Sequence, residues 1–97
     1  MPPKSIWYFV GCGNDPSCED VLLRATYSPN RPVALKVAND WNLRNRWARA
    51  FVNDKKEAVI EMDISAYGGI GRDAVEGMVN TFFKIVRDFS KELEASN

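Results

Sequence analysis

The first third of the chain carries two stretches of strand-like hydrophobic pattern. Residues 6–10 form a β-branched and aromatic run that ends in a dense cluster of turn residues at 11–18. In residues 21–26 one set of alternate positions is entirely apolar, and the pattern stops at a second turn at 27–30. These patterns predict two strands joined by a hairpin loop.

A helical period replaces the alternation after this turn. One helix face is formed at i, i+3, i+4 and i+7 by Ala34, Val37, Ala38 and Trp41. Pro32 is suited to a first helical turn, where its missing N–H would have no partner in any case. The spacing predicts a short amphipathic helix within residues 32–45.

The rest of the chain again has a hairpin followed by a helix. Residues 47–52 and 58–64 flank a polar turn at 53–56, and apolar residues alternate along the second run. A glycine-rich stretch at 65–71 follows, with Gly71 as a candidate N-cap of a long final helix. The apolar stripe of this helix consists of Val75, Met78, Val79, Phe82, Val86, Phe89 and Leu93.

The predicted order of elements is therefore β-β-α-β-β-α, with the strands in hairpin pairs. Hairpin pairing favours an antiparallel sheet with helices packed against it, which is an α+β fold. The chain has 97 residues, of which 45% are hydrophobic and 27% charged, so its composition is that of an ordinary globular protein. This length has room for a single domain, residues 1–97.

Charge and missing residue types narrow the function. The 13 Lys and Arg residues balance 13 Asp and Glu residues, so no basic field draws nucleic acid to a surface. No apolar run approaches the ~20 residues of a membrane span. The absence of histidine removes the usual general base and the commonest metal ligand. We therefore expect a non-enzymatic protein without cofactor or metal, whose partner is another protein.

Two cysteines, Cys12 and Cys18, bracket the first hairpin loop. Opposed strand positions lie within reach of a disulfide, so a bridge is geometrically easy and would staple this hairpin. Two free thiols in a reducing cytoplasm are the alternative. A bridge would indicate the periplasm and free thiols the cytoplasm, and the sequence leaves both open.

The turn Gly68-Gly69-Ile70-Gly71 leads from a strand into a helix, a context in which backbone N–H groups can cradle an anion. With Arg72 it is the basis of an alternative function, a small-ligand or anion sensor. The turn lacks the Lys-Ser or Lys-Thr step of a phosphate-binding loop. A tight turn that allows positive φ is the better explanation.

Three carboxylates, Glu57, Glu61 and Asp63, lie on one predicted strand, and Glu61 and Asp63 share a face. They could serve acid–base or metal chemistry. A solvated sheet face, with Arg46 or Arg49 across the strands, is the favoured interpretation, because opposite charges on neighbouring strands are common stabilisers.

Two tryptophans, Trp41 and Trp47, frame a segment rich in Asn and Arg that could stack on RNA bases. Core packing of both is favoured, since Trp41 lies on the apolar stripe of its helix and Trp47 opens the next predicted strand.

The final helix has a wider apolar face than one stripe. Met78 and Ile85 extend it on one side and Phe83 on the other, to an arc of about 160° at ~100° per residue. The arc forms either a deep core within one chain or an interface with a partner. A symmetric homodimer through these three residues is one expectation.

A string of residues in the middle of the chain resembles a known family. It comprises Asn39, Trp41, Asn42, Arg46, Ala48, Arg49, Ala50 and Phe51, then Glu61, Met62 and Asp63, and finally Gly68 and Gly69. In order and spacing it resembles the YbjN-like family, whose members are described as bacterial sensory transduction regulators. The hairpin that contains Cys12 and Cys18 is similar to that of exported family members.

The resemblance implies an α+β domain similar to type III secretion chaperones, which dimerise and hold protein segments. It therefore implies a protein-interaction module of regulatory or chaperone-like type, and it carries over no catalytic residue. Family members usually begin with a further helix and strand. The resemblance thus implies a single domain that lacks this N-terminal part.

Overall fold

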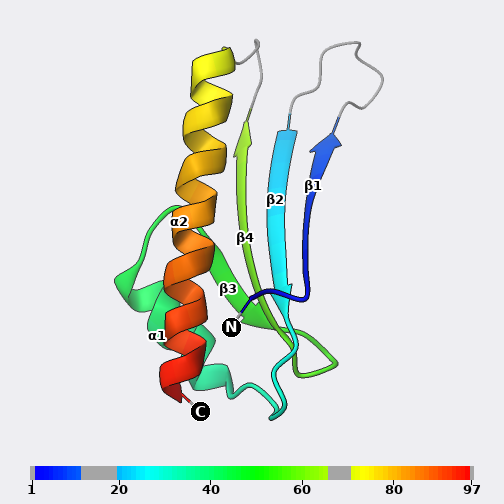
Figure 1. Ribbon diagram of the computed structural model, residues 1–97, viewed down its shortest axis with the longest axis vertical. Coiled ribbons are helices and arrows are strands. Elements are labelled where there is room, and N and C mark those ends of the chain that lie inside the picture. The colour runs from blue at the N-terminus through cyan, green and yellow to red at the C-terminus, as the bar shows by residue number, and fades with distance from the viewer. Residues whose placement is uncertain (1, 12–19, 66–70, 97) are drawn as a thin grey trace.

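The computed structural model describes residues 2–11, 20–65 and 71–96 (Figure 1). In chain order its elements are β1 Ser5–Gly11, β2 Asp20–Tyr27, α1 Leu35–Arg44, β3 Arg49–Val52, β4 Ala58–Ser65 and α2 Arg72–Ser96. The predicted order β-β-α-β-β-α is confirmed, and so is the α+β class.

The four strands form one antiparallel sheet in the order β1-β2-β4-β3. Each hairpin supplies one edge strand and one inner strand. The inner strands β2 and β4 pair along their full length, from Asp20 opposite Ser65 to Tyr27 opposite Ala58. The edges of the sheet are therefore β1 and β3, which lie far apart.

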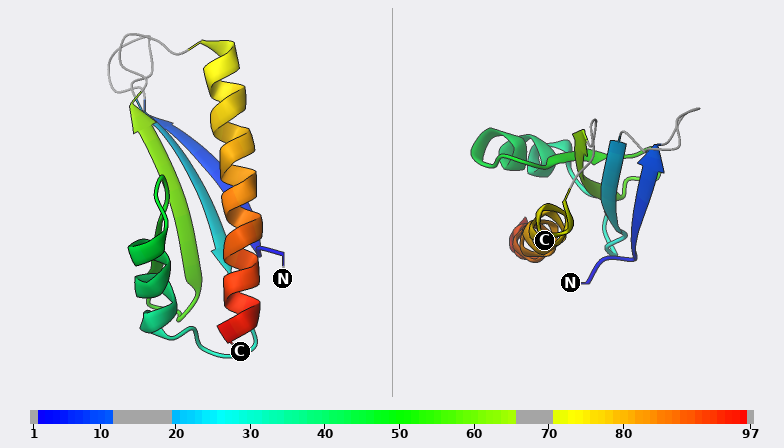
Figure 2. Two further views of the ribbon diagram at one scale, coloured as in Figure 1. Left: turned by 90° about the vertical axis from the view of Figure 1, so that its left-hand side faces the viewer. Right: turned by 90° about the horizontal axis from the view of Figure 1, so that it is seen from above.

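The final helix packs against one face of this sheet (Figure 2). It runs nearest to β4 and farthest from β1, while α1 lies beside β3 and contacts α2. Because side chains alternate between the faces of a sheet, one set of positions in β2 and β4 points at α2. With the buried stripe of α2, these form the core: Leu23, Ala25, Tyr27, Ile60, Met62, Met78, Phe82, Val86, Phe89 and Leu93.

An aromatic cluster fixes the C-terminal half of α2 to the sheet. The ring of Phe89 makes edge-on contacts with Tyr27 and Trp41, at centroid distances of 5.5 and 5.2 Å. The Tyr27 hydroxyl donates to the carbonyl of Val86 (2.8 Å) and accepts from the Ser90 hydroxyl (3.0 Å). Burial raises the pKa of Tyr27 above its ordinary value, and the Ser90 hydrogen bond opposes this. This half of the helix is thus held by both packing and hydrogen bonds.

The first helix begins later than the sequence predicts. It starts at Leu35, and its N-cap Ala34 is extended (φ −74°, ψ 142°) without a side-chain cap. The N–H of Val33 donates to the carbonyl of Lys56 in the β3–β4 turn (3.2 Å), which holds this part of the chain against the sheet. Pro32 therefore precedes the helix instead of forming its first turn.

Trp47 does not open β3, and the prediction that it packs in the core is wrong. Its backbone is left-handed (φ 76°) and the residue is 72% exposed. This conformation costs an aromatic residue about 1–3 kcal/mol, and here it redirects the chain between α1 and β3. Trp41, in contrast, is 3% exposed, in agreement with its predicted place in the core.

Candidate protein-binding site

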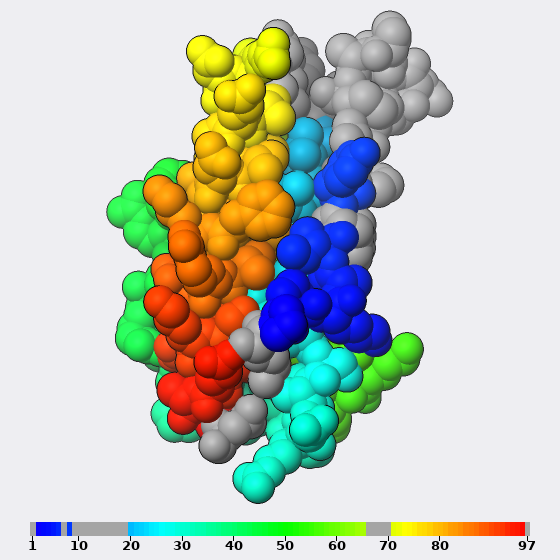
Figure 3. Space-filling model, in the orientation of Figure 1, coloured from blue at the N-terminus to red at the C-terminus, as the bar shows by residue number. Residues whose placement is uncertain are grey.

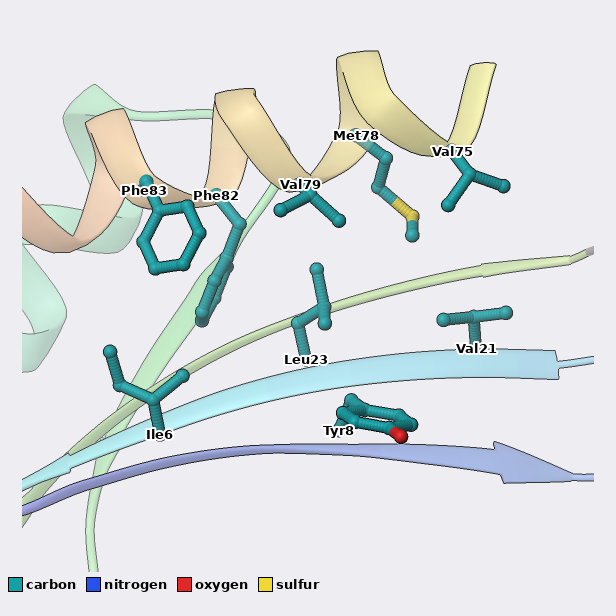
Figure 4. Close-up of a pocket in the computed structure, with 9 residues that line it drawn as sticks. All are labelled: Ile6, Tyr8, Val21, Leu23, Val75, Met78, Val79, Phe82 and Phe83. Carbon is teal, nitrogen blue, oxygen red and sulfur yellow. The ribbon is translucent and has the colours of Figure 1, made fainter. Parts of the chain in front are cut away.

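A groove of about 420 Å³ separates the N-terminal half of α2 from β1 and β2 (Figure 3). Figure 4 shows the side chains that line it from both sides. The lining residues are Ile6, Tyr8, Val21, Leu23, Val75, Met78, Val79, Phe82 and Phe83. Only Tyr8 among them has a side chain with an oxygen or nitrogen atom. Such a concave apolar surface suits the apolar groups of a partner.

The floor of the groove is buried and its rim is exposed. On the floor, Leu23 is 9% and Phe82 1% exposed. On the rim, Ile6 is 44%, Phe83 52% and Tyr8 72% exposed. The rim therefore exposes several large apolar side chains side by side. On an ordinary protein surface, exposed apolar residues are scattered singly.

The groove exists because α2 does not reach across the sheet. The helix lies nearest to β4, so its flank faces β1 from a distance (Figure 2). The side chains that extend from this flank towards the strands near its N-terminus include the short Val75 and Val79 (Figure 4). Nearer the C-terminus, large residues such as Phe89 fill the space over the sheet. The hollow is thus confined to the N-terminal half of the helix.

Of the three residues predicted for an interface, only Phe83 is exposed. Met78 is 9% exposed and belongs to the core of its own chain, so the prediction that it is available for an interface is wrong. Ile85 is half-buried against the core. It lies two positions after Phe83, which is ~200° around the helix, and therefore on the opposite flank.

The sequence did not single out the strand side of the groove. Ile6 and Tyr8 occupy alternate positions of β1 and lie opposite Ala25 and Leu23 of β2, on the side that faces α2. The continuous apolar and aromatic run at residues 6–10 was the available signal. It could not show that α2 leaves these two side chains uncovered.

A second hollow of about 420 Å³ lies on the other flank of α2, lined by Trp47, Met62, Ile64, Ala74, Gly77, Met78 and Thr81. The guanidinium of Arg46 lies 5.2 Å from the centre of the Trp47 ring, a cation–π contact. A Cβ atom on Gly77 would meet nothing within 4 Å, so packing does not require glycine here. Glycine within a helix costs about 0.5–1 kcal/mol relative to alanine, and this one widens the hollow.

The sheet face opposite α2 carries a row of charged residues. Glu61 accepts hydrogen bonds from Arg24 Nε (2.7 Å) and Arg49 Nε (2.6 Å), its partners in the sheet register. Arg49 also reaches Asp63 (3.3 Å). The expected pairing with Arg49 is present, whereas Arg46 takes no part. Glu61 is 4% exposed instead of solvated, because two guanidinium groups cover it. With both oxygens bonded, it stabilises the sheet and is not available as a free carboxylate.

Asn42 closes the β3 edge of the sheet. Its side-chain Nδ2 donates to the carbonyl of Ala50 (3.0 Å), and its Oδ1 accepts from the N–H of Ala50 (2.8 Å). The amide thus takes the place that a neighbouring strand would occupy at Ala50. Asn39 lies on the same helix and is exposed.

An ion pair ties the segment before β1 to the β3–β4 turn. Glu57 accepts hydrogen bonds from Lys4 Nζ (2.7 Å) and from Asn53 Nδ2 (3.0 Å). These contacts, that of Lys4 first, lower the pKa of Glu57 from 4.5 to about 2. The role of Glu57 is therefore structural, because the folded chain stabilises its ionised form.

Four predicted site residues, Cys12, Cys18, Gly68 and Gly69, lie outside the described residues. The next part of the glycine turn is described: the Gly71 carbonyl accepts from the N–H of Val75 (3.1 Å) at the start of α2. Within residues 2–11, 20–65 and 71–96, no group of His, Cys, Asp and Glu side chains could hold a metal ion. No helix in those ranges is both long and apolar enough to cross a membrane.

The sequence model of one protein family matches residues 7–95, a range that reaches from β1 to α2. That family is YbjN, whose description is "putative bacterial sensory transduction regulator". This chain belongs to the YbjN family. The resemblance seen in the sequence is therefore confirmed. No curated protein matches the chain, and no solved structure does.

In this YbjN-family chain, the string of family-like residues and the groove lie in different places. Among its described members, Trp41 joins α1 to α2, Asn42 joins α1 to β3, and the pair of Arg49 and Glu61 belongs to the charged row of the sheet. None of the nine residues that line the groove belongs to the string. These members of the string thus stabilise the fold, while the groove is a separate feature of the surface.

Proposed function

We propose that this YbjN-family chain is a non-enzymatic module of bacterial regulation that binds another protein through the groove between α2 and β1. The observation that carries the proposal is the exposed rim, where Ile6, Tyr8 and Phe83 surround one concave surface. Exposed apolar side chains that gather in this way mark interaction surfaces. A chaperone-like function, in which a segment of another protein is held in the groove, is one form of this proposal.

The lining of the groove supports binding over catalysis. Nucleophilic or acid–base chemistry requires side chains that donate an electron pair or transfer a proton. Eight of the nine lining side chains are aliphatic, thioether or phenyl groups, and the ninth is the phenol of Tyr8. A surface of this composition recognises apolar groups by burying them.

The energy available at the rim indicates how strong such binding can be. Burial of one fully exposed large apolar side chain is worth about 1.5–3 kcal/mol. The three rim residues are already partly covered, so each contributes a part of this amount. Association itself costs an estimated ~4–15 kcal/mol, so a tight complex needs further contacts beyond the rim.

The homodimer predicted from the final helix would use the same exposed Phe83. A stable interface involves about 20–30 residues a side, whereas nine residues line the groove. We therefore expect self-association through this surface to be weak. Sedimentation from low to high micromolar concentration measures it, and a tight dimer that persists in the Phe83→Glu variant would show that another surface is used.

The anion-sensor alternative has less support. Arg72, its only described cation, lies 3.5 Å from Glu76, which offsets its charge. Phosphate and nucleotides are expected to leave the melting temperature unchanged. A dose-dependent rise would favour the sensor instead.

The main proposal is tested by retention of proteins from a bacterial lysate on the immobilised chain. Phe83→Glu places a charge on the rim, and Leu43→Glu is a matched control, because Leu43 is 84% exposed on α1 and does not line the groove. Both variants should keep the far-UV spectrum of the parent. Partners that Phe83→Glu loses and Leu43→Glu keeps support the proposal; partners that both variants keep would contradict it.

A further inference from the structure

The β1 edge of the sheet is open beside the groove. β1 pairs with β2 over seven residues, and no described strand lies on its other side. Along such an edge, alternate residues direct their N–H and C=O groups away from the sheet, where only water or another strand can satisfy them. Ser5, Ile6 and Tyr8 are all exposed, so a partner can reach this edge.

The two edges of the sheet differ in how they are protected. Edge strands are usually covered by another element, or carry charges and proline, because they otherwise pair with other chains. At the β3 edge, α1 lies alongside and Asn42 bonds both backbone groups of Ala50. The β1 sequence, Ser5–Gly11, contains neither a charged residue nor proline. Of the two edges, β1 is therefore the one suited to pairing.

We infer that an extended segment of a partner protein pairs with β1 as a fifth strand and inserts alternate apolar side chains into the groove. This inference rests on the proposed function and specifies the kind of partner. Residues two apart in a strand lie about 6.6–6.8 Å from each other and point to the same face. Residues of the partner segment that lie beside Ile6 and Tyr8 therefore point towards α2. There, Phe83 and Val79 lie on the other side of the groove (Figure 4).

Strand addition supplies the contacts that the rim alone lacks. Main-chain hydrogen bonds to the open edge contribute affinity, and the groove selects the side chains at alternate positions. The partner segment should thus have large apolar residues with period two and no proline at the positions that bond to β1.

The dimensions of the surface favour such a segment over a second copy of the chain. Nine residues line the groove, fewer than the ~20–30 a side of a stable dimer. If two copies paired through β1, each would bring Ile6 and Tyr8 to the other's groove. These side chains already line their own groove, so the two hollows would merge instead of being filled.

The test uses the full chain and random peptides displayed on phage. Selected peptides that the unmodified chain and Leu43→Glu retain, and Phe83→Glu does not, are synthesised and their affinities measured. We expect apolar residues at i, i+2 and i+4. Methylation of single peptide nitrogens should then weaken binding by about three- to tenfold at every second position, where a hydrogen bond to β1 is lost, with little effect between them.

Four results would overturn the inference. Apolar residues at helical spacing would indicate a helix in the groove, and equal effects of methylation along the peptide would exclude strand pairing. A tight dimer that Phe83→Glu dissociates would identify a second copy as the occupant. Absence of any retained peptide, while lysate partners still depend on Phe83, would refute strand addition and leave the proposed function intact. Lysate partners that do not depend on Phe83 would instead contradict the proposed function.

Discussion

The contact between Asn42 and Ala50 offers a sharp test of how the β3 edge is closed. Asn42→Ala removes two hydrogen bonds, of 2.8 and 3.0 Å, to the backbone of Ala50. Each is worth about 0.5–1.5 kcal/mol net, which gives a loss of about 1–3 kcal/mol for the pair. Ala50 is 5% exposed, so water can only partly replace the lost contacts. The free energy of unfolding should fall accordingly.

Asn39→Ala is the matched control for this substitution. Asn39 is exposed on the same helix, and no side-chain hydrogen bond joins it to the described residues. Both variants gain the higher helix propensity of alanine, up to about 0.7 kcal/mol, so their difference isolates the bonds to Ala50.

Urea unfolding of the two variants measures that difference. Small proteins have m values of about 1–3 kcal/mol per M, so Asn42→Ala should unfold at a urea concentration lower by roughly 1 M than Asn39→Ala. Hydrogen exchange of the Ala50 amide should also become faster, since its acceptor is gone. Equal midpoints, or an unchanged Ala50 exchange rate, would refute the reasoning.

Three further predictions follow from other parts of the chain. Gly77→Ala should raise the free energy of unfolding by about 0.5–1 kcal/mol, because the new Cβ atom meets nothing within 4 Å; a loss in urea unfolding would contradict this. Stability should decline as the pH falls from 4.5 to about 2, because folded Glu57 keeps its charge down to the lower value while the unfolded carboxyl is protonated near the higher one. Lys4→Met should flatten that part of the pH profile of unfolding, and an unchanged profile would show that Lys4 does not lower the pKa. If the chain is periplasmic, mass spectrometry after alkylation should find no modified Cys12 or Cys18, whereas two modified thiols in protein prepared under oxidising conditions would favour the cytoplasm.

Local pattern was enough to predict the elements and the pairing within each hairpin, whereas the pairing of β2 with β4 appears only in the structure. The period of two in residues 21–26 and 58–64 and the helical stripe of residues 75–93 each depend on neighbours in the sequence, and the corresponding elements are β2, β4 and α2. Short turns then require antiparallel hairpins. Errors arose where a distant contact or an unusual backbone conformation overrode the local pattern. The bond from Val33 to Lys56 holds the chain before α1 out of the helix, and the left-handed backbone of Trp47 turns that residue outwards.

Apart from Phe83, the candidate site could not be predicted from the sequence, because it depends on the spacing between elements. Ile6 and Phe83 are far apart in the chain, and each has a pattern that fits a core position equally well. Whether they are buried depends on where α2 crosses the sheet, and the aromatic cluster of Tyr27, Trp41 and Phe89 sets that position from the opposite end of the helix. Periodicity thus determined which side chains face the helix side of the sheet, while the tertiary packing decided which of them the helix leaves uncovered, because a helix that lies along β4 cannot also cover β1.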